Sequence, residues 1–250
     1  NSSAASDVYK RQLLHKPSVP FEQLRYEAYQ LEKAFAWPPP KRASLEDVRL
    51  YVLVSGNAKG RPVLEVLEEV LDGGCTMVQL REKEMADGEF LELARKARQL
   101  THRAGALLII NDRADIARQV GADGVHVGQS DLPVHEARQV VGFDRLVGVS
   151  THSADQAAAA EAAGADYLGV GPVFASPTKP ELPSKGVELV RAVTHIRIPF
   201  FAIGGITLEN LPRVQAVGAT RVAVSSDIIN ADDISERTRA FLIAMKSRTR

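Results

Sequence analysis

Short apolar runs alternate with longer amphipathic segments from about residue 49 onward. The runs are hydrophobic at successive positions, which is typical of strands buried on both faces of a parallel sheet. The segments between them, such as RPVLEVLEEVLDG (61–73), EFLELARKARQLTHRAG (89–105) and LENLPRVQAVG (208–218), have the period of amphipathic helices. Eight strands are predicted: 50–55, 76–80, 107–110, 124–127, 146–150, 167–171, 200–204 and 222–226.

A recurring turn separates several helices from the strands that follow. Gly-Ala pairs begin at Gly105, Gly121, Gly164 and Gly218, and Gly73-Gly74 takes the same place earlier. A glycine that ends a helix just before a strand is typical of the αβ loops of α/β folds. The first strand is followed by SGNAKGRP (55–62), which lacks the GxGxxG spacing of a doubly wound sheet. We therefore predict a single α/β domain, a (β/α)8 TIM barrel.

The N-terminal part has a different character. Residues 1–20 show no periodicity, and we interpret them as a disordered leader or a remnant. Residues 21–36 place Phe21, Leu24, Ala28, Leu31 and Phe35 on one helical face, and Pro38 to Pro40 end this additional helix. The sequence leaves open whether this helix packs on the barrel or on a second copy in a homo-oligomer. The expected organisation is a leader (1–20), a helical extension with a Pro-rich linker (21–45) and a catalytic barrel (46–250).

Composition narrows the classes of partner. Lys and Arg total 31 and Asp and Glu total 31, so the net charge of zero predicts no nucleic-acid or membrane partner. The single cysteine, Cys75, excludes an intrachain disulfide and is expected to be a buried residue. No apolar run reaches the ~20 residues of a membrane span, and no secretory signal is evident. A cytoplasmic location is expected.

Polar residues follow the apolar runs at one end of the predicted barrel. Active sites of such barrels are built at the C-terminal ends of the strands, so these residues are the candidates for chemistry. In strand order they are Gln79, Arg81, Lys83, Asn111, Asp112, Asp131, Ser150, Ser176, Thr178, Lys179, Gly204, Gly205, Ser225 and Ser226.

The residue types indicate what this end could bind. Arg81, Lys83 and Lys179 come from two loops and could converge on a polyanion. Asp112 and Asp131 follow neighbouring strands and suit Mg²⁺, which takes one or two carboxylates together with phosphate oxygens and waters. Backbone amides after the last two strands often bind phosphate. The pattern therefore predicts two phosphorylated ligands or one doubly phosphorylated ligand.

Each candidate also has a purely structural interpretation. Asp112 and Asp131 could be the N-caps of the helices that follow them, and the Gly204-Gly205 pair could only relieve crowding at the rim. His126 is expected to be a hydrogen-bonded barrel residue rather than a metal ligand. His152 could begin a helix or contact a ligand, and the sequence does not decide between these. The joint occurrence of the polar residues at one rim favours a site.

Five segments together resemble one enzyme family in order and spacing. These are QLREK (79–83), LLIINDRADIARQVGADGVHVGQSDLP (107–133), VGVSTHS (147–153), ADYLGVGPVFASPTKP (165–180) and FAIGGIT (201–207). They resemble thiamine phosphate synthases over residues 49–230. The resemblance implies condensation of 4-amino-2-methyl-5-(diphosphooxymethyl)pyrimidine with 4-methyl-5-(2-phosphoethyl)thiazole. The implied products are thiamine phosphate and pyrophosphate, with Mg²⁺ as cofactor and small molecules as partners.

The resemblance also implies residue roles. The pyrimidine diphosphate would be bound by Gln79, Arg81, Lys83, Asn111, Ser150 and Lys179, of which Arg81, Lys83, Ser150 and Lys179 would be catalytic. The thiazole phosphate would be bound by Ser176, Thr178, Gly205, Ser225 and Ser226, and Mg²⁺ by Asp112 and Asp131. The chain departs from the family pattern at Ser176, usually Thr, and at Ser225-Ser226-Asp227, where Asp227 adds a carboxylate near the expected phosphate site.

Two other functions stay open. A related thiazole tautomerase would need an acid/base group such as His152 and has no use for Asp112, Asp131 and Lys83 together. A non-catalytic barrel could bind a thiazole or thiamine phosphate as a sensor, with the additional helix as its interaction element.

Overall fold

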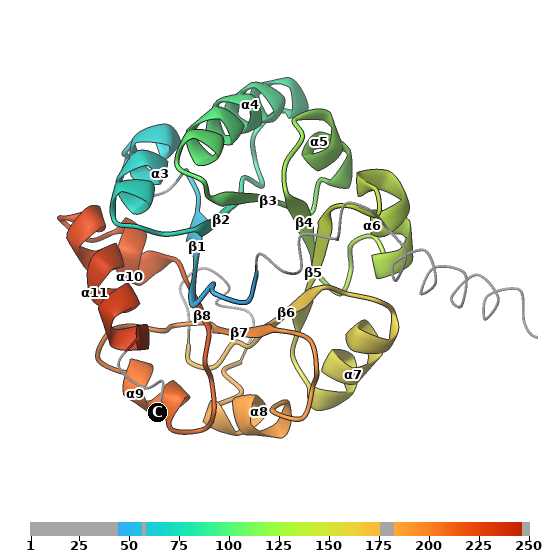
Figure 1. The fold of residues 1–250 in the computed structure, drawn as a ribbon, viewed down its shortest axis with the longest axis vertical. Coiled ribbons are helices and arrows are strands. Elements are labelled where there is room, and N and C mark those ends of the chain that lie inside the picture. Colours follow the sequence, from blue (N-terminus) through green and yellow to red (C-terminus); the bar gives the residue numbers. More distant parts are fainter. Residues whose placement is uncertain (1–44, 57–58, 176–182, 247–250) are drawn as a thin grey trace, which may run out of the picture. The chain divides into compact units, whose positions relative to one another are not determined.

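Eight parallel strands form a closed barrel inside a ring of helices in a computed structural model of the chain (Figure 1). The structure describes residues 45–56, 59–175 and 183–246. The strands are β1 (Leu50–Val54), β2 (Met77–Leu80), β3 (Leu107–Asn111), β4 (Gly124–Val127), β5 (Leu146–Thr151), β6 (Tyr167–Val170), β7 (Phe200–Ile203) and β8 (Val222–Val224). The helices of the described part are α3 (Val63–Asp72), α4 (Asp87–Arg103), α5 (Ala114–Gln119), α6 (Val134–Val141), α7 (Ala154–Ala162), α8 (Val187–Ala192), α9 (Leu211–Gln215), α10 (Ser226–Ile229) and α11 (Ile234–Lys246).

The strands pair in sequence order, and β8 closes the barrel against β1 with Leu50 opposite Val222. The predicted TIM barrel is confirmed, and each predicted strand is present to within a residue or two. Two boundaries differ from the prediction. β8 ends at Val224, so Ser226 begins α10 instead of extending the strand. α9 begins only at Leu211, because Pro212 has no backbone N–H and is tolerated in the first turn of a helix.

The chain divides into two compact units, residues 1–37 and 38–250. The first unit lies outside the described residues, and so do the predicted leader and the predicted helix over 21–36. Among the described helices, none has the length and apolar character needed to cross a bilayer.

Apolar side chains pack in two layers of the barrel. The larger core fills the space between the strands and the surrounding helices, and a smaller one fills the barrel interior around Tyr51, Met77, Tyr167 and Phe201. Cys75 is buried as predicted, and burial raises the pKa of its thiol to about 11. A thiol in this state is a poor nucleophile at neutral pH.

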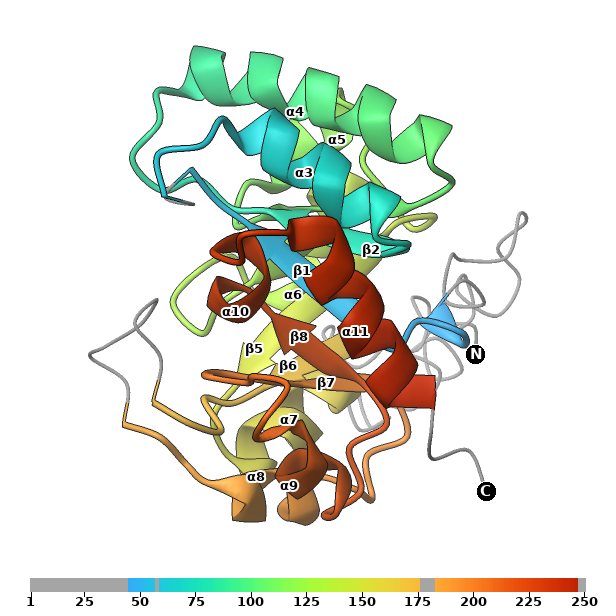
Figure 2. The same ribbon diagram turned by 90° about the vertical axis from the view of Figure 1, so that its left-hand side faces the viewer.

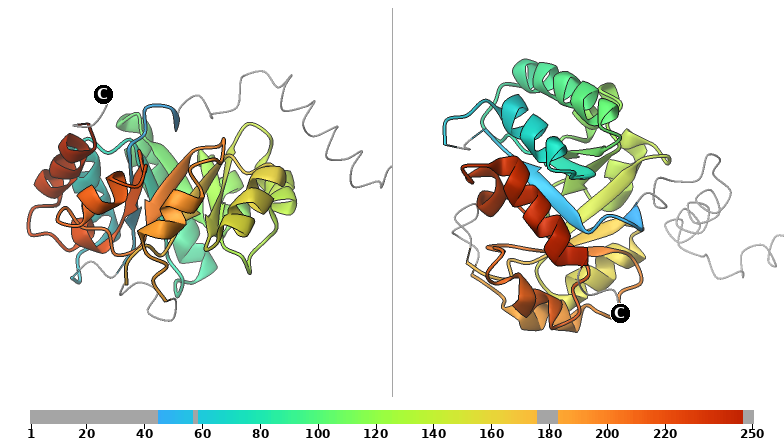
Figure 3. Two further views of the ribbon diagram at one scale, coloured as in Figure 1. Left: turned by 90° about the horizontal axis from the view of Figure 1, so that it is seen from below. Right: turned by 60° about the vertical axis from the view of Figure 1, so that its left-hand side comes forward.

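The last helix completes the wall of the barrel. α11 lies beside α3 and β1, with α10 at its N-terminal end (Figures 2 and 3). Phe241 and Met245 of α11 are buried in the outer core. This packing holds the β8–α10 turn, and with it Ser225 and Ser226, at the end of the barrel where the strands terminate.

The repeated glycine turns place an aspartate at the start of two strands. Gly121 and Gly164 have φ angles of 65° and 87°, in the left-handed region that glycine adopts without strain. The aspartates that follow reach back to the preceding strand: Asp123 Oδ2 accepts from the N–H of Leu108 and Asp166 Oδ2 from that of Val147, both at 2.8 Å. The sequence repeat therefore encodes a contact between neighbouring βα units.

Each of these aspartates also pairs with an arginine of the preceding helices. Asp123 accepts from Arg98 of α4 at 2.9 Å, and Asp166 pairs with Arg138 of α6. The Arg98 side chain is 23% exposed, whereas that of Arg138 is 2% exposed. The Arg138–Asp166 ion pair is therefore almost completely shielded from water. Loss of one partner would leave the other charge buried and unpaired.

We expect Asp166→Ala to lower the free energy of unfolding by about 3–5 kcal/mol, the usual cost of breaking a buried pair. Asp123→Ala is the matched control. It changes the equivalent glycine turn, but the arginine that loses its partner, Arg98, can be solvated. Urea unfolding of both full-length variants measures the difference. Equal losses in the two variants would contradict the assignment of the cost to the buried Arg138 charge.

Candidate active site

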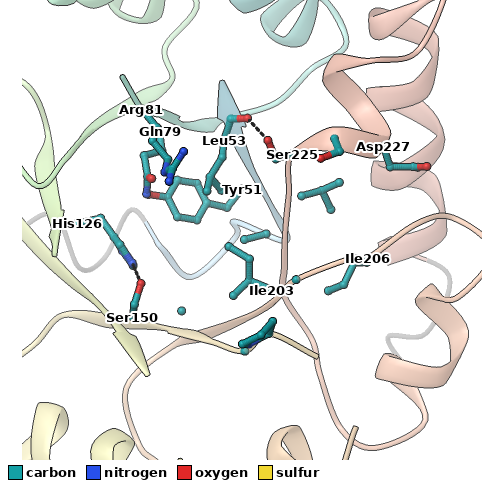
Figure 4. A pocket seen from close by; sticks show the side chains of 18 of the residues that line it. Tyr51, Leu53, Gln79, Arg81, His126, Ser150, Ile203, Ile206, Ser225 and Asp227 are labelled. Carbon is teal, nitrogen blue, oxygen red and sulfur yellow. Dashed lines mark hydrogen bonds between the residues drawn. The ribbon is translucent and has the colours of Figure 1, made fainter. Parts of the chain in front are cut away.

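A cavity of about 390 Å³ opens at the C-terminal end of the strands (Figure 4). Its floor is formed by side chains of the barrel interior, including Tyr51, His126 and Ile203. Its walls are formed by residues at or just after the strand ends, including Ser150 of β5 and Ser225 after β8. The cavity therefore lies where the fold predicts an active site.

Seven of the residues predicted to bind a substrate line this cavity, and the candidate Gly204 lines it as well. The seven come from five different strand ends and are Gln79, Arg81, Asn111, Ser150, Gly205, Ser225 and Ser226. The segments that supply them are far apart in the sequence but adjacent around the barrel. Ser176, Thr178 and Lys179, which are also predicted to bind ligand, lie outside the described residues.

Asp112 and Asp131 do not line the cavity, but they interact with each other beside it. Burial raises the pKa of Asp112, and a hydrogen bond with Asp131 and the negative charge of Asp131 raise it further. The positive charge of Lys83 acts in the opposite direction. The structure thus brings together the two predicted carboxylates and one predicted cation, as the strand-end positions implied.

The interpretation of these aspartates as helix caps is wrong. α5 has Arg113 at its N-cap and α6 has Pro133, and neither helix has a side-chain capping bond. Asp131 Oδ2 instead accepts from the N–H of Gly128 at 2.6 Å. A Cβ atom at Gly128 would lie 2.8 Å from that oxygen, so the glycine permits the carboxylate to fold back against the strand end.

Asp112 also has an unfavourable backbone conformation. Its φ of 59° is in the left-handed region, which is uncommon for residues other than glycine. Its N–H donates to the carbonyl oxygen of His126 at 2.8 Å, which fixes the turn after β3 against β4. Strain of this kind persists where the surroundings enforce it and is frequent at functional sites.

We expect Asp112→Asn to stabilise the protein when no divalent cation is present, by roughly 1 kcal/mol or 2–4 °C in Tm. The pKa of Asp112 is raised in the folded state, so stability falls as the pH rises from its ordinary pKa to the raised one. Asparagine cannot ionise and tolerates φ > 0 better than most residues. Thermal unfolding at pH 7 and at pH 3 provides the measurement and its control, because the charge contribution vanishes at the lower pH. A lower Tm at pH 7 would contradict the like-charge interaction.

The glycine pair after β7 is required by packing. Gly204 and Gly205 have φ angles of 103° and 58°. A Cβ at Gly205 would lie 2.2 Å from the carbonyl oxygen of Ala175, and one at Gly204 would lie 2.6 Å from Pro172. The structural interpretation of the pair, relief of crowding at the rim, is therefore confirmed, while phosphate binding by Gly205 stays a prediction.

All three residues of the Ser225-Ser226-Asp227 turn line the cavity, but the Asp227 carboxylate is directed away from the cavity floor. The Ser225 hydroxyl donates to the carbonyl oxygen of Leu53 at 2.9 Å, which ties the end of β8 to β1. Asp227 Oδ2 pairs with Arg237 of α11 at 3.5 Å. In Figure 4 the Asp227 carboxylate points away from Tyr51 and Ile203. The partner on α11 therefore offsets the negative charge that distinguishes this turn.

Tyr51, His126 and His152 also line the cavity, and of these only His152 is a possible ligand contact from the sequence. Tyr51 lines the floor, and Gln79 Nε2 donates to its hydroxyl at 2.5 Å. His126 is hydrogen-bonded inside the barrel, as predicted, and its Nε2 lies 3.0 Å from Ser150 Oγ. His152 also lines the cavity, and its Nδ1 donates to the carbonyl oxygen of Gly171 at 2.5 Å. α7 begins after Ser153, so His152 is not a helix-start residue.

The alternation of side chains along the strands indicates which polar residues face the barrel interior. Neighbouring strands place Asn111 opposite His126 and His126 opposite Gly148, so these residues share the inward face. A histidine between two valines in GVHV points to the opposite face from both. The sequence alone cannot show that its partners are Tyr167 and Ser150, which come from other strands.

Comparisons with known proteins agree on one family. The family model described as thiamine monophosphate synthase matches residues 50–228. A thiamine-phosphate synthase of Chloroflexus aurantiacus is 46% identical over 200 residues, which cover 79% of this chain and 92% of that protein. A thiamine-phosphate synthase of Thermosynechococcus vestitus is 44% identical over 222 residues, or 88% of this chain. The chain spans only 62% of the length of that relative.

Solved structures extend the agreement to the fold. The thiamine phosphate pyrophosphorylase of Pyrococcus furiosus is 34% identical, with a TM-score of 0.73 over 79% of this chain and 95% of that one. A 3-hexulose-6-phosphate synthase has a TM-score of 0.61 at 22% identity over 78% of this chain and 99% of that one, and this likeness shows the barrel fold alone.

Proposed function

The chain belongs to the thiamine monophosphate synthase family, and from this premise we propose that it is a thiamine phosphate synthase. It would join 4-amino-2-methyl-5-(diphosphooxymethyl)pyrimidine to 4-methyl-5-(2-phosphoethyl)thiazole and release pyrophosphate. The observation that carries the proposal is the convergence of seven predicted ligand-binding residues on one cavity at the strand ends. Beside that cavity stand Asp112, Asp131 and Lys83, which suit a diphosphate and a divalent cation.

The proposed reaction breaks the bond between the pyrimidine CH₂ and the diphosphate oxygen, and the electron pair leaves with pyrophosphate. The aminopyrimidine ring stabilises the positive charge that develops on the CH₂ carbon. Arg81, Lys83 and Lys179 would bind the departing pyrophosphate and stabilise its growing negative charge. Gln79, Asn111 and Ser150 would hold the pyrimidine so that its CH₂ faces the second substrate.

The thiazole nitrogen would then form the new C–N bond. This nitrogen carries no proton, so the reaction needs no general base. Gly205, Ser225, Ser226, Ser176 and Thr178 would hold the phosphate of the thiazole, which orients the nitrogen toward the CH₂ group. Gly205 and the two serines line the same cavity as Gln79 and Ser150, which supports the proposal that the two substrates meet there.

Magnesium fits the residues beside the cavity. Asp112 and Asp131 are two interacting carboxylates, and a cation between them would relieve the repulsion that raises the pKa of Asp112. Among the described residues, no group of three or more His, Cys, Asp or Glu side chains could hold a metal, so diphosphate oxygens would have to complete the coordination. Bound there, Mg²⁺ would supply positive charge to the pyrophosphate leaving group.

The decisive experiment mixes the full chain with both substrates and Mg²⁺ and measures pyrophosphate. The proposal expects release only when both substrates are present. Isomerisation of the thiazole carboxylate phosphate without the diphosphate would instead indicate a tautomerase. Binding of thiazole phosphate or thiamine phosphate without turnover would indicate a sensor barrel. The cytoplasmic location and the homo-oligomer stay predictions.

A further inference from the structure

A continuous chain of hydrogen-bonded side chains crosses the interior of the barrel beneath the cavity. Gln79 of β2 donates to Tyr51 of β1 at 2.5 Å, and the Tyr51 hydroxyl lies 3.1 Å from that of Tyr167 on β6. The Tyr167 hydroxyl lies 3.2 Å from Nδ1 of His126 on β4, and the His126 Nε2 lies 3.0 Å from the Ser150 hydroxyl on β5. Figure 4 shows both ends of this chain at the cavity.

The interior members of the chain are shielded from water. Tyr51 and Tyr167 are 2% and 0% exposed, and His126 is 7% exposed. Burial raises the pKa of both tyrosines well above the usual value, so each hydroxyl keeps its proton. A neutral phenol has one hydrogen to donate, and leaving it without an acceptor in the interior would be costly.

These facts give the chain a direction. The Gln79 amide nitrogen can only donate, so the Tyr51 oxygen accepts from it and the Tyr51 hydrogen is directed to Tyr167. The Tyr167 hydrogen is then directed to Nδ1 of His126. A neutral imidazole that accepts at Nδ1 carries its hydrogen on Nε2, which faces Ser150.

We propose that Tyr167 and His126 are positioning residues that fix the Ser150 hydroxyl as a hydrogen-bond donor toward the cavity. The Ser150 oxygen accepts from His126 Nε2, so its own hydrogen is free to meet a ligand. At the other end the amide group of Gln79 still carries an acceptor oxygen. The inference rests on the proposed function: an aminopyrimidine offers a ring nitrogen as acceptor and an amino group as donor, which complements these two ends.

The tautomer of His126 tests the direction without any need for turnover. In a long-range ¹H–¹⁵N spectrum of the full chain labelled at histidine, we expect His126 to carry its hydrogen on Nε2. The spectrum of His126→Gln assigns the signal among the six histidines. His152 provides an internal contrast, because its Nδ1 contacts a carbonyl oxygen that can only accept, and it should therefore be the opposite tautomer. A His126 hydrogen on Nδ1 would overturn the proposed direction.

The Tyr167→Phe variant tests the positioning role. It removes the hydroxyl between Tyr51 and His126 while it keeps the ring. We expect the share of the Nε2–H tautomer to fall and the apparent KM for the pyrimidine diphosphate to rise about tenfold, with the KM for the thiazole phosphate unchanged. Phe201→Leu is the packing control. The ring centroid of Phe201 lies 5.3 Å from that of Tyr51 and 5.7 Å from that of Tyr167, and a phenylalanine side chain cannot form a hydrogen bond with either hydroxyl.

The outcomes separate this inference from the proposed function. If Tyr167→Phe and Phe201→Leu changed the KM values for the two substrates to the same extent, Tyr167 would act only by packing. That result would overturn the positioning role. A KM change specific to the pyrimidine substrate, together with the tautomer change, supports it. If the wild-type chain released no pyrophosphate, the proposed function would fail, while the tautomer measurement would still decide the direction of the hydrogen-bond chain.

Discussion

Replacement of either Asp112 or Asp131 by alanine is expected to lower Mg²⁺-dependent turnover by about 100- to 1,000-fold. The two carboxylates interact with each other and are the described candidates for holding a cation beside the diphosphate. Loss of one would weaken the positive charge that faces the leaving group, and removal of one such stabilising group typically costs about 3–4 kcal/mol in the transition state. Steady-state pyrophosphate release over a range of Mg²⁺ concentrations measures the effect.

Two controls make this result specific to the metal. Asp144→Ala removes an exposed carboxylate in the α6–β5 connection, where it pairs with Arg145, and should leave turnover unchanged. Wild-type turnover should depend on Mg²⁺, and the Asp112→Ala and Asp131→Ala variants should not recover at saturating Mg²⁺ if both ligands are essential. Turnover within tenfold of wild type in both variants would remove the metal assignment.

Arg81→Ala is expected to reduce kcat/KM for the pyrimidine diphosphate by about 100-fold. Arg81 follows β2 and lines the cavity, where its guanidinium can donate to phosphate oxygens in a bidentate manner. A hydrogen bond to a charged group contributes about 1.5–3 kcal/mol of binding free energy. Two N–H groups of one guanidinium that bind the same phosphate contribute more than a single hydrogen bond. Arg81→Lys should recover only part of the loss, because an ammonium group cannot make the fork.

The KM for the thiazole phosphate is the internal reference for the effect of Arg81→Ala. If Arg81 acts on the diphosphate, the KM for the thiazole phosphate should change little in the Arg81→Ala variant. Arg95→Ala is the matched control, since Arg95 lies on α4 outside the barrel and pairs with the exposed Glu92. Equal changes for both substrates would contradict the division of the cavity into two anion sites.

The barrel could be predicted from the sequence because its elements are encoded locally. Strands buried on both faces are continuous apolar runs, and the left-handed glycines at Gly121 and Gly164 mark the helix ends. The positions of the polar residues at the strand ends followed from the fold class alone. Gln79, Asn111 and Ser150 line the cavity because they lie in the strands, whose alternation fixes the direction of each side chain.

Residues beyond the strand ends were harder to place. Asp131 bonds back to Gly128 and Asp112 adopts a left-handed φ, so the loop backbone decides where their carboxylates point. The interior hydrogen bonds were harder still, because Tyr51 and Tyr167 are 116 residues apart and each resembles an ordinary core aromatic. Such partners are set by the closure of the barrel and by the register of strands that are not neighbours in sequence.

Asp112 and Asp131 are expected to share one divalent cation next to a diphosphate bound by cationic side chains. A crystal structure of the wild-type chain with Mn²⁺ and pyrophosphate tests it most directly, since the anomalous signal locates the metal. We expect one ion that contacts both carboxylates and pyrophosphate oxygens, with Arg81 and Lys83 bound to the same pyrophosphate. An ion bound away from either carboxylate, or pyrophosphate held elsewhere on the barrel, would contradict it.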